Sequence, residues 1–94
     1  MRAIEFAKAF RRDFKRIQAT PRHRDTIDGL LEQVVGLLAI DRTLPINYRD
    51  HALTGDWNSY RECHLKPDLL LIYRKPNGYI LRLARIGSHS ELFR

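Results

Sequence analysis

The stretch LLLIYRKPNGYILRLARI, residues 69–86, decides the fold of this 94-residue chain. Residues 69–75 and 79–86 are rich in Leu, Ile and Tyr, and runs of this length and composition are typical of buried strands. The sequence PNG at 76–78 lies between them and is a strong signal for a hairpin turn. We therefore predict two antiparallel strands joined by a short connection.

A third strand is expected directly upstream. Residues 57–65 have strand-like composition, and Lys66-Pro67-Asp68 forms a turn sequence between them and the next strand. The three segments predict an antiparallel meander. Residues 41–56 contain Pro, Asn and Gly and read as a loop, and at about 16 residues this loop is long for a small domain, as functional loops often are.

In the first half of the chain the apolar residues recur with a helical spacing. Residues 2–6 are interpreted as a short first strand. In residues 7–18 apolar side chains recur at spacings of four and three, which predicts an amphipathic helix with a basic outer surface. Thr20-Pro21 ends it. Asp25 is a plausible N-cap for a second helix, which the apolar periodicity carries to Ile40.

The order of elements is therefore β-α-α-β-β-β. We predict an α+β fold in which an antiparallel sheet carries a two-helix hairpin packed on one face. Ninety-four residues allow one core, so residues 1–94 are expected to form one domain. Ser88 and Glu91 have the spacing of a capping box, which predicts a final helical turn.

The composition of the chain indicates which kind of partner it binds and in which cellular compartment it acts. The chain has 17 Lys and Arg against 11 Asp and Glu, a formal net charge of +6, which favours an anionic partner. No apolar run approaches the ~20 residues that span a bilayer, and the N-terminus lacks the pattern of a secretory signal, so we expect a cytoplasmic protein without membrane contact. Cys63 is the one cysteine and is interpreted as a buried strand residue without chemistry.

Three histidines lie where structural breaks meet predicted strands or the C-terminal turn. They are His51, His64 and His89. An imidazole has an ordinary pKa of about 6.5 and can donate or accept a proton near neutral pH. Set on a basic surface that can hold phosphates, such side chains indicate cleavage of an RNA backbone.

Three motifs carry a resemblance to a known family. They are NYRDHALTG at 47–55, YRECHLKPDLLLIYR at 60–74 and RIGSHSELF at 85–93. In this order they resemble the YafQ-like branch of the RelE/ParE toxin superfamily, and the predicted element order agrees with that family's fold.

The resemblance implies a toxin of a type II toxin–antitoxin module that acts as a ribosome-dependent mRNA endoribonuclease and needs no metal or cofactor. Its implied partners are a cognate antitoxin, the ribosome and mRNA in the ribosomal A site. Operator DNA would be contacted only through the antitoxin complex.

The family's functional positions fall, by the same resemblance, on His51, His64, Asp68, His89 and Phe93. The sequence departs from some members in one respect, because Leu69 stands where they carry Trp after the PD pair. If that Trp stacks on a base, its replacement would alter codon preference or weaken activity.

Metal-independent cleavage requires a base, an acid and groups that stabilise negative charge. His89 is expected to be the general acid. Either His64 or Asp68 is the base, with Asp68 placed to orient an imidazole, although Asp68 also suits a turn after Pro67. His51 is a second base, a phosphate ligand or a wall of the site.

Four further residues are expected to bind the RNA. Arg61, Lys66 and Arg85 are candidates for holding phosphate, and Phe93 either stacks on a nucleotide or covers the edge of the core. His23 lies between two arginines in the interhelical turn and is expected at the surface.

The leading hypothesis is an endoribonuclease that leaves a 2′,3′-cyclic phosphate or 3′-phosphate and a 5′-hydroxyl. Two alternatives remain open. One is a toxin of the same fold that inhibits a protein target such as gyrase, and the other is a non-catalytic RNA-binding module.

Overall fold

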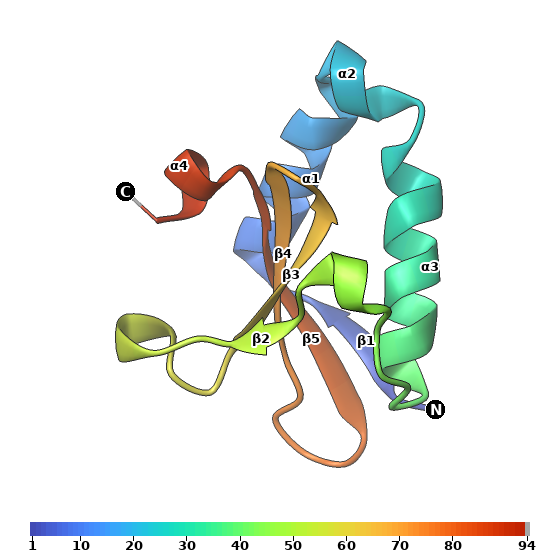
Figure 1. Ribbon diagram of the computed structural model, residues 1–94, viewed down its shortest axis with the longest axis vertical. Helices are drawn as coiled ribbons and strands as arrows, with labels where there is room; N and C mark the ends of the chain where they lie inside the picture. Colours follow the sequence, from blue (N-terminus) through green and yellow to red (C-terminus); the bar gives the residue numbers. More distant parts are fainter. Residues whose placement is uncertain (94) are drawn as a thin grey trace.

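The computed structural model describes residues 1–93 and is built on a five-stranded sheet of order β1-β5-β4-β3-β2 (Figure 1). The strands are β1 Ala3–Phe6, β2 His51–Ala52, β3 Arg61–Lys66, β4 Leu69–Arg74 and β5 Ile80–Gly87. The predicted meander is confirmed, because β4 pairs antiparallel with both β3 and β5. In the β4–β5 connection the Asn77 side chain accepts hydrogen bonds from the backbone N–H groups of Tyr79 and Ile80, at 2.8 and 3.1 Å.

The sheet is antiparallel except at β1. This strand runs parallel to β5, with Ala3 opposite Ile80. The expectation of an antiparallel sheet was wrong for this pair, because no hairpin joins β1 to its neighbour and the helices that follow β1 set its direction. The fifth strand, β2, comes from the region predicted to be a loop.

The helices are α1 Lys8–Ala19, α2 Pro21–Arg24, α3 Ile27–Ala39 and α4 His89–Leu92, with 3-10 turns η1 Ile46–Tyr48 and η2 Gly55–Trp57. The two long helices and the first strand confirm the sequence prediction. Pro21 ends α1 as expected, but it occupies the first turn of α2, a position where its missing N–H has no cost. Asp25 is not the cap of α3, since Thr26 takes that position without a side-chain bond.

The third strand begins later than predicted. Trp57 belongs to η2, and Ser59 has a positive φ of 80°, so the chain is extended only from Arg61. A tryptophan near a strand start suggested a strand residue, but here its ring packs against Tyr60, with ring centroids 5.2 Å apart.

The core lies on both faces of the sheet. Alternate residues of β4 point to opposite sides, and Leu71 and Tyr73 pack with Phe10 of α1 and Val34 of α3. The other face is covered by a smaller cluster to which α4 contributes Leu92; its buried members are Leu70, Ile72, Ala84 and Leu92. Figure 1 shows α3 and α4 on opposite sides of the strands. In residues 1–93 no helix is long and apolar enough to cross a membrane.

Candidate active site

The face of the sheet away from α1 and α3 carries a cluster of His51, Glu62 and His64. Glu62 and His64 are two residues apart on β3, so their side chains lie on the same face. His51 is the direct cross-strand partner of Glu62 in the β2–β3 pair. Nε2 of His64 is 3.4 Å from Oε1 of Glu62, and Nε2 of His51 is 3.7 Å from the same oxygen.

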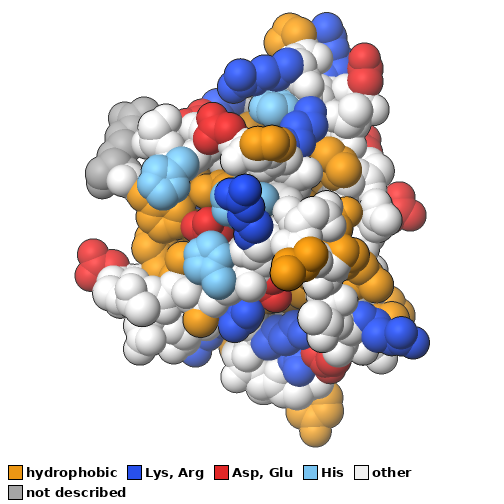
Figure 2. All heavy atoms as spheres, viewed as in Figure 1, with side chains coloured by type: hydrophobic (Ala, Val, Ile, Leu, Met, Phe, Trp, Pro, Cys, Tyr) orange, Lys and Arg blue, Asp and Glu red, His pale blue; other side chains and the backbone are white. Residues whose placement is uncertain are grey.

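The side chains of the cluster become more exposed with distance from the sheet. Glu62 is 5% exposed, whereas the side chain of His64 is 18% exposed and that of His51 is 51% exposed. A buried carboxylate is costly without partners, and the two imidazoles supply them. Figure 2 shows histidine side chains gathered on this face, with basic and acidic groups among them.

The second nitrogen of each ring faces a backbone carbonyl. Nδ1 of His51 is 2.7 Å from the oxygen of Arg49, and Nδ1 of His64 is 3.4 Å from that of Pro67. The His51 ring therefore lies between the carbonyl of Arg49 and the carboxylate of Glu62, which together fix its orientation. His64 is held by longer contacts, which a substrate hydroxyl could replace.

Asp68 and His89 approach each other through the backbone. The N–H of His89 donates to Oδ1 of Asp68 at 3.4 Å, which ties the turn before β4 to the start of α4. Asp68 was expected to orient the ring of His64, but within residues 1–93 the ring of His64 instead meets the carbonyl of Pro67 and the carboxylate of Glu62. The bulge between His64 and Lys66 shifts the register of β3 at this point.

Aromatic side chains border the site on the α4 side. The rings of His89 and Phe93 lie 5.0 Å apart, one helical turn from each other. Phe93 also meets Trp57 edge-on at 6.3 Å. Phe93 is half-buried, so it offers a surface for stacking while also covering part of the smaller core cluster.

The three predicted phosphate-binding cations already have partners within the protein. Arg61 donates to Asp50 at 3.3 Å, and Lys66 donates to the carbonyl of Arg22 at 2.9 Å. Arg85 is bound to the buried Asp13 by two hydrogen bonds, at 2.5 and 3.1 Å. These contacts give Arg85 a structural task that the sequence did not suggest.

His23 is not at the surface, so that expectation was wrong. It is 7% exposed, and its Nδ1 lies 3.1 Å from Nζ of Lys66. Burial, together with the positive charges of Lys66 and Arg22, lowers the pKa of His23. A short helix, α2, turns the ring inward where a plain interhelical turn would have left it exposed.

Cys63 follows its prediction. It is fully buried on β3, and burial raises the pKa of its thiol to about 12. Because the pKa of this thiol lies far above neutral pH, the side chain stays protonated and offers no thiolate nucleophile.

Sequence reasoning missed Glu62. Its position two residues before His64 on a predicted strand was a usable signal, because alternate strand residues share a face. The carboxylate of Glu62 also lies on β3 at a position that the fold buries. A buried acid beside a candidate catalytic histidine is a stronger indication of function than the turn-forming Asp68.

Among residues 1–93, no three His, Cys, Asp or Glu side chains form a group that could hold a metal ion. The prediction that activity needs no metal remains a prediction.

Comparison with known proteins gives a consistent result. The family model described as "Bacterial toxin of type II toxin-antitoxin system, YafQ" matches residues 2–94. The chain is 40% identical over 94 residues to the mRNA interferase toxin YafQ of Escherichia coli K12, covering 98% of this chain and 96% of that protein.

Solved structures agree in fold. The YafQ structure in the E. coli DinJ–YafQ complex is 37% identical with a TM-score of 0.84 and covers 100% of both chains. A metal-bound toxin from Helicobacter pylori is 46% identical with a TM-score of 0.84, covering 99% of this chain and 100% of the other.

Proposed function

Because this chain belongs to the YafQ family of bacterial type II toxin–antitoxin toxins, we propose that it is a ribosome-dependent, metal-independent mRNA endoribonuclease that inhibits translation. The observation that carries the proposal is the pairing of His51 and His64 with the buried Glu62, beside the aromatic side chains of α4. Proton-transfer groups and a stacking surface stand together on one exposed face of a basic protein.

The proposed reaction is attack of a ribose 2′-hydroxyl on the adjacent phosphorus. The 2′-O–P bond forms and the P–O5′ bond breaks, while a base takes the hydroxyl proton and an acid protonates the leaving 5′-oxygen. The products are a 2′,3′-cyclic phosphate, which water can open to a 3′-phosphate, and a 5′-hydroxyl. No metal or cofactor is consumed or required in this sequence.

The roles of the histidines in this proposal follow from their positions. His51 lies at the exposed edge of the site, beside Glu62, and acts as a phosphate ligand or a second base. His64 acts as the base in this proposal, supported by its 3.4 Å contact with Glu62, and Asp68 is the alternative base. His89 is the general acid, since it begins α4 at the exposed rim of the site.

The RNA is proposed to lie along this face with Phe93 against a base. The side chain of Arg61 is 43% exposed against 24% for Arg85, and Arg61 remains a candidate for a phosphate contact. Like Lys66 and Arg85, Arg61 would first have to leave its internal partner. Leu69 is buried in the helix-side core, so it does not replace the missing Trp as a stacking surface.

A cognate antitoxin is the proposed partner, as the E. coli relative has DinJ. The complex is proposed to contact operator DNA through the antitoxin, and the toxin to act in the cytoplasm on mRNA in the ribosomal A site. The whole of residues 1–94 is proposed to act as one domain.

The test is expression in cells with 5′-end mapping of mRNA. Wild type is expected to arrest growth and to leave codon-phased cuts. His89→Ala and His64→Ala are expected to abolish both, whereas Gln33→Ala, an exposed change on α3, leaves them intact. Arrest that persists without cuts would instead point to a protein target, and an absence of arrest in the wild type would overturn the toxin activity.

A further inference from the structure

Asp13 is a buried carboxylate that joins three parts of the fold. It is 0% exposed, on the face of α1 that also buries Phe10 and Ile17. Its Oδ2 accepts from Nε of Arg85 at 2.5 Å and from the backbone N–H of Ile86 at 3.2 Å. Burial acts to raise the pKa of Asp13, but the bonds from Arg85 and Ile86 outweigh it and lower the pKa. Asp13 therefore stays charged and fixes α1 to the edge of β5.

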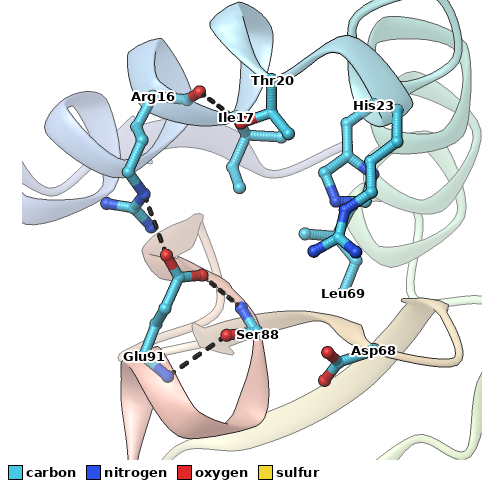
Figure 3. A pocket seen from close by; sticks show the side chains of 9 residues that line it. Arg16, Ile17, Thr20, His23, Asp68, Leu69, Ser88 and Glu91 are labelled. Carbon is cyan, nitrogen blue, oxygen red and sulfur yellow. Dashed lines mark hydrogen bonds and ion pairs between the residues drawn. The ribbon is translucent and has the colours of Figure 1, made fainter.

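Arg16 extends this connection to α4. One turn after Asp13, its Nη1 donates to Oδ1 of Asp13 at 3.2 Å, and its Nε lies 3.1 Å from Oε2 of Glu91. Figure 3 shows the Arg16 side chain reaching from α1 to Glu91 on α4. One guanidinium thus links the buried acid to the helix that carries His89.

Glu91 uses its two oxygens for two tasks. Oε1 accepts from the N–H of Ser88 at 2.8 Å, and Ser88 Oγ accepts from the N–H of Glu91 at 3.2 Å, which together form the predicted capping box. Oε2 remains for Arg16. The cap forms α4, while the ion pair fixes where the formed helix lies.

Gly87 gives an independent sign that this approach is close. A Cβ at this position would lie 3.0 Å from Oε1 of Glu91, 3.2 Å from Nη2 of Arg16 and 3.3 Å from Cδ2 of Leu92. A side chain at residue 87 would crowd the ion pair, so glycine suits the passage of the chain from β5 into α4. Both the backbone at Gly87 and the Arg16–Glu91 ion pair therefore favour the same position of α4.

We propose that Asp13, Arg16, Arg85 and Glu91, here called the α4 anchor, hold α4 in the position that places His89 and Phe93 at the RNA-cleaving site. This inference rests on the proposed function. Arg16 and Glu91 are positioning residues, since they act through α4 and the His89–Phe93 ring pair. A helix of four residues has too few internal bonds to keep its own place, so its position depends on such contacts.

The test compares Arg16→Ala, Arg16→Lys and Glu91→Gln with Arg42→Ala, which removes an exposed arginine beyond α3. Glu91→Gln keeps an oxygen for the cap but removes the charge that pairs with Arg16. Single-turnover cleavage is measured on ribosomes that carry a defined mRNA, below the melting temperature of every variant. Misplacement of a catalytic group by about 1 Å can cost about a hundredfold in rate, so the single-turnover rate at saturating enzyme should fall about ten- to a hundredfold. KM should rise by less than the increase of about tenfold expected for complete loss of the Phe93 ring.

Two further results are expected if the α4 anchor acts as a unit. The double variant Arg16→Ala/Glu91→Gln should lose little more activity than either single variant, because both remove the same ion pair. Arg16→Lys should recover part of the rate. Additive losses, or a single-turnover rate equal to that of Arg42→Ala, would overturn the proposal.

A structural measurement separates this proposal from the proposed function. The nuclear Overhauser contact between the rings of His89 and Phe93, and amide exchange in α4, are followed by NMR in the same variants. The contact should weaken and exchange should speed up in Arg16→Ala and Glu91→Gln. If the wild type cuts no RNA yet these signals change, only the cleavage function fails; if they do not change, the α4 anchor is wrong.

Discussion

The Oε1 oxygen of Glu62 lies 3.4 Å from Nε2 of His64, on the face of β3 opposite the long helices. The acid is buried and the imidazole is half-buried, so the pair is shielded on the sheet side and open toward solvent. Such an acid fixes the orientation of an imidazole and stabilises its charged form, which is the arrangement that proton transfer by histidine requires.

Replacing Glu62 by Gln should lower the single-turnover cleavage rate by about ten- to a hundredfold, because both imidazoles lose their shared negative charge. Quench-flow cleavage of ribosome-bound mRNA measures the rate. Asp56→Asn, which alters an exposed acid in η2, serves as the control. A rate equal to that of the control would show that Glu62 only fills space beneath the histidines.

Phe93→Ala should raise KM about tenfold, since stacking of one base on an aromatic ring contributes about 1–3 kcal/mol. Phe93→Tyr should retain the wild-type value. Tyr79→Ala is a matched control, because Tyr79 is an aromatic side chain that is 79% exposed in the β4–β5 connection. If Phe93→Ala lowers the melting temperature without changing KM, the ring covers the core and does not contact RNA.

Tyr73→Phe should reduce the free energy of unfolding by about 1 kcal/mol, the usual loss for one hydrogen bond. The Tyr73 hydroxyl donates to Oδ1 of Asp50 at 2.6 Å. Asp50 is the residue directly before His51 in the chain. Burial, together with this bond, raises the pKa of Tyr73. Urea unfolding measures the stability, with Tyr79→Phe as the exposed control. Equal losses in the two variants would show that the bond to Asp50 adds nothing.

The lowered pKa of His23 makes the free energy of unfolding depend on pH. Its pKa in the folded protein is lowered below the ordinary 6.5, so the unfolded chain takes up the proton first as the pH falls. The stability due to the neutral ring is therefore present above pH 6.5 and is lost as the pH falls toward the folded pKa.

Urea unfolding of the wild type and of His23→Gln at several pH values between 7.5 and 5 tests this sign. The wild type should lose more stability than the variant over this interval, because only the wild type carries the titrating ring. Two parallel stability curves would contradict the assignment.

The strands and long helices were predictable because each has its own periodicity. Apolar spacing located α1 and α3, and the PNG turn located the β4–β5 hairpin. The unbroken apolar run of β4 also follows from its position, since it is buried on both faces. Local sequence was sufficient for these elements.

The remaining errors concern features that depend on distant partners. The two residues of β2 form a strand only because β3 pairs with them, and no local propensity marks so short a segment. No role was predicted for Glu62 or Asp13, because their burial depends on how distant elements pack. For Asp13 a signal did exist, because its spacing from Phe10 and Ile17 places it on the apolar face of α1.

The parallel pairing of β1 with β5 has a consequence for the order of folding. The first strand of the sheet must wait for its last strand, Ile80–Gly87, before it has a neighbour. Pairings between such distant segments are slow, because a long loop must close before any contact forms. α4 follows directly after β5, so during synthesis the acid and the aromatic side chain proposed for cleavage emerge only after the strand that β1 needs as its neighbour. A growing chain that ends before β5 therefore lacks both the partner of β1 and the proposed general acid.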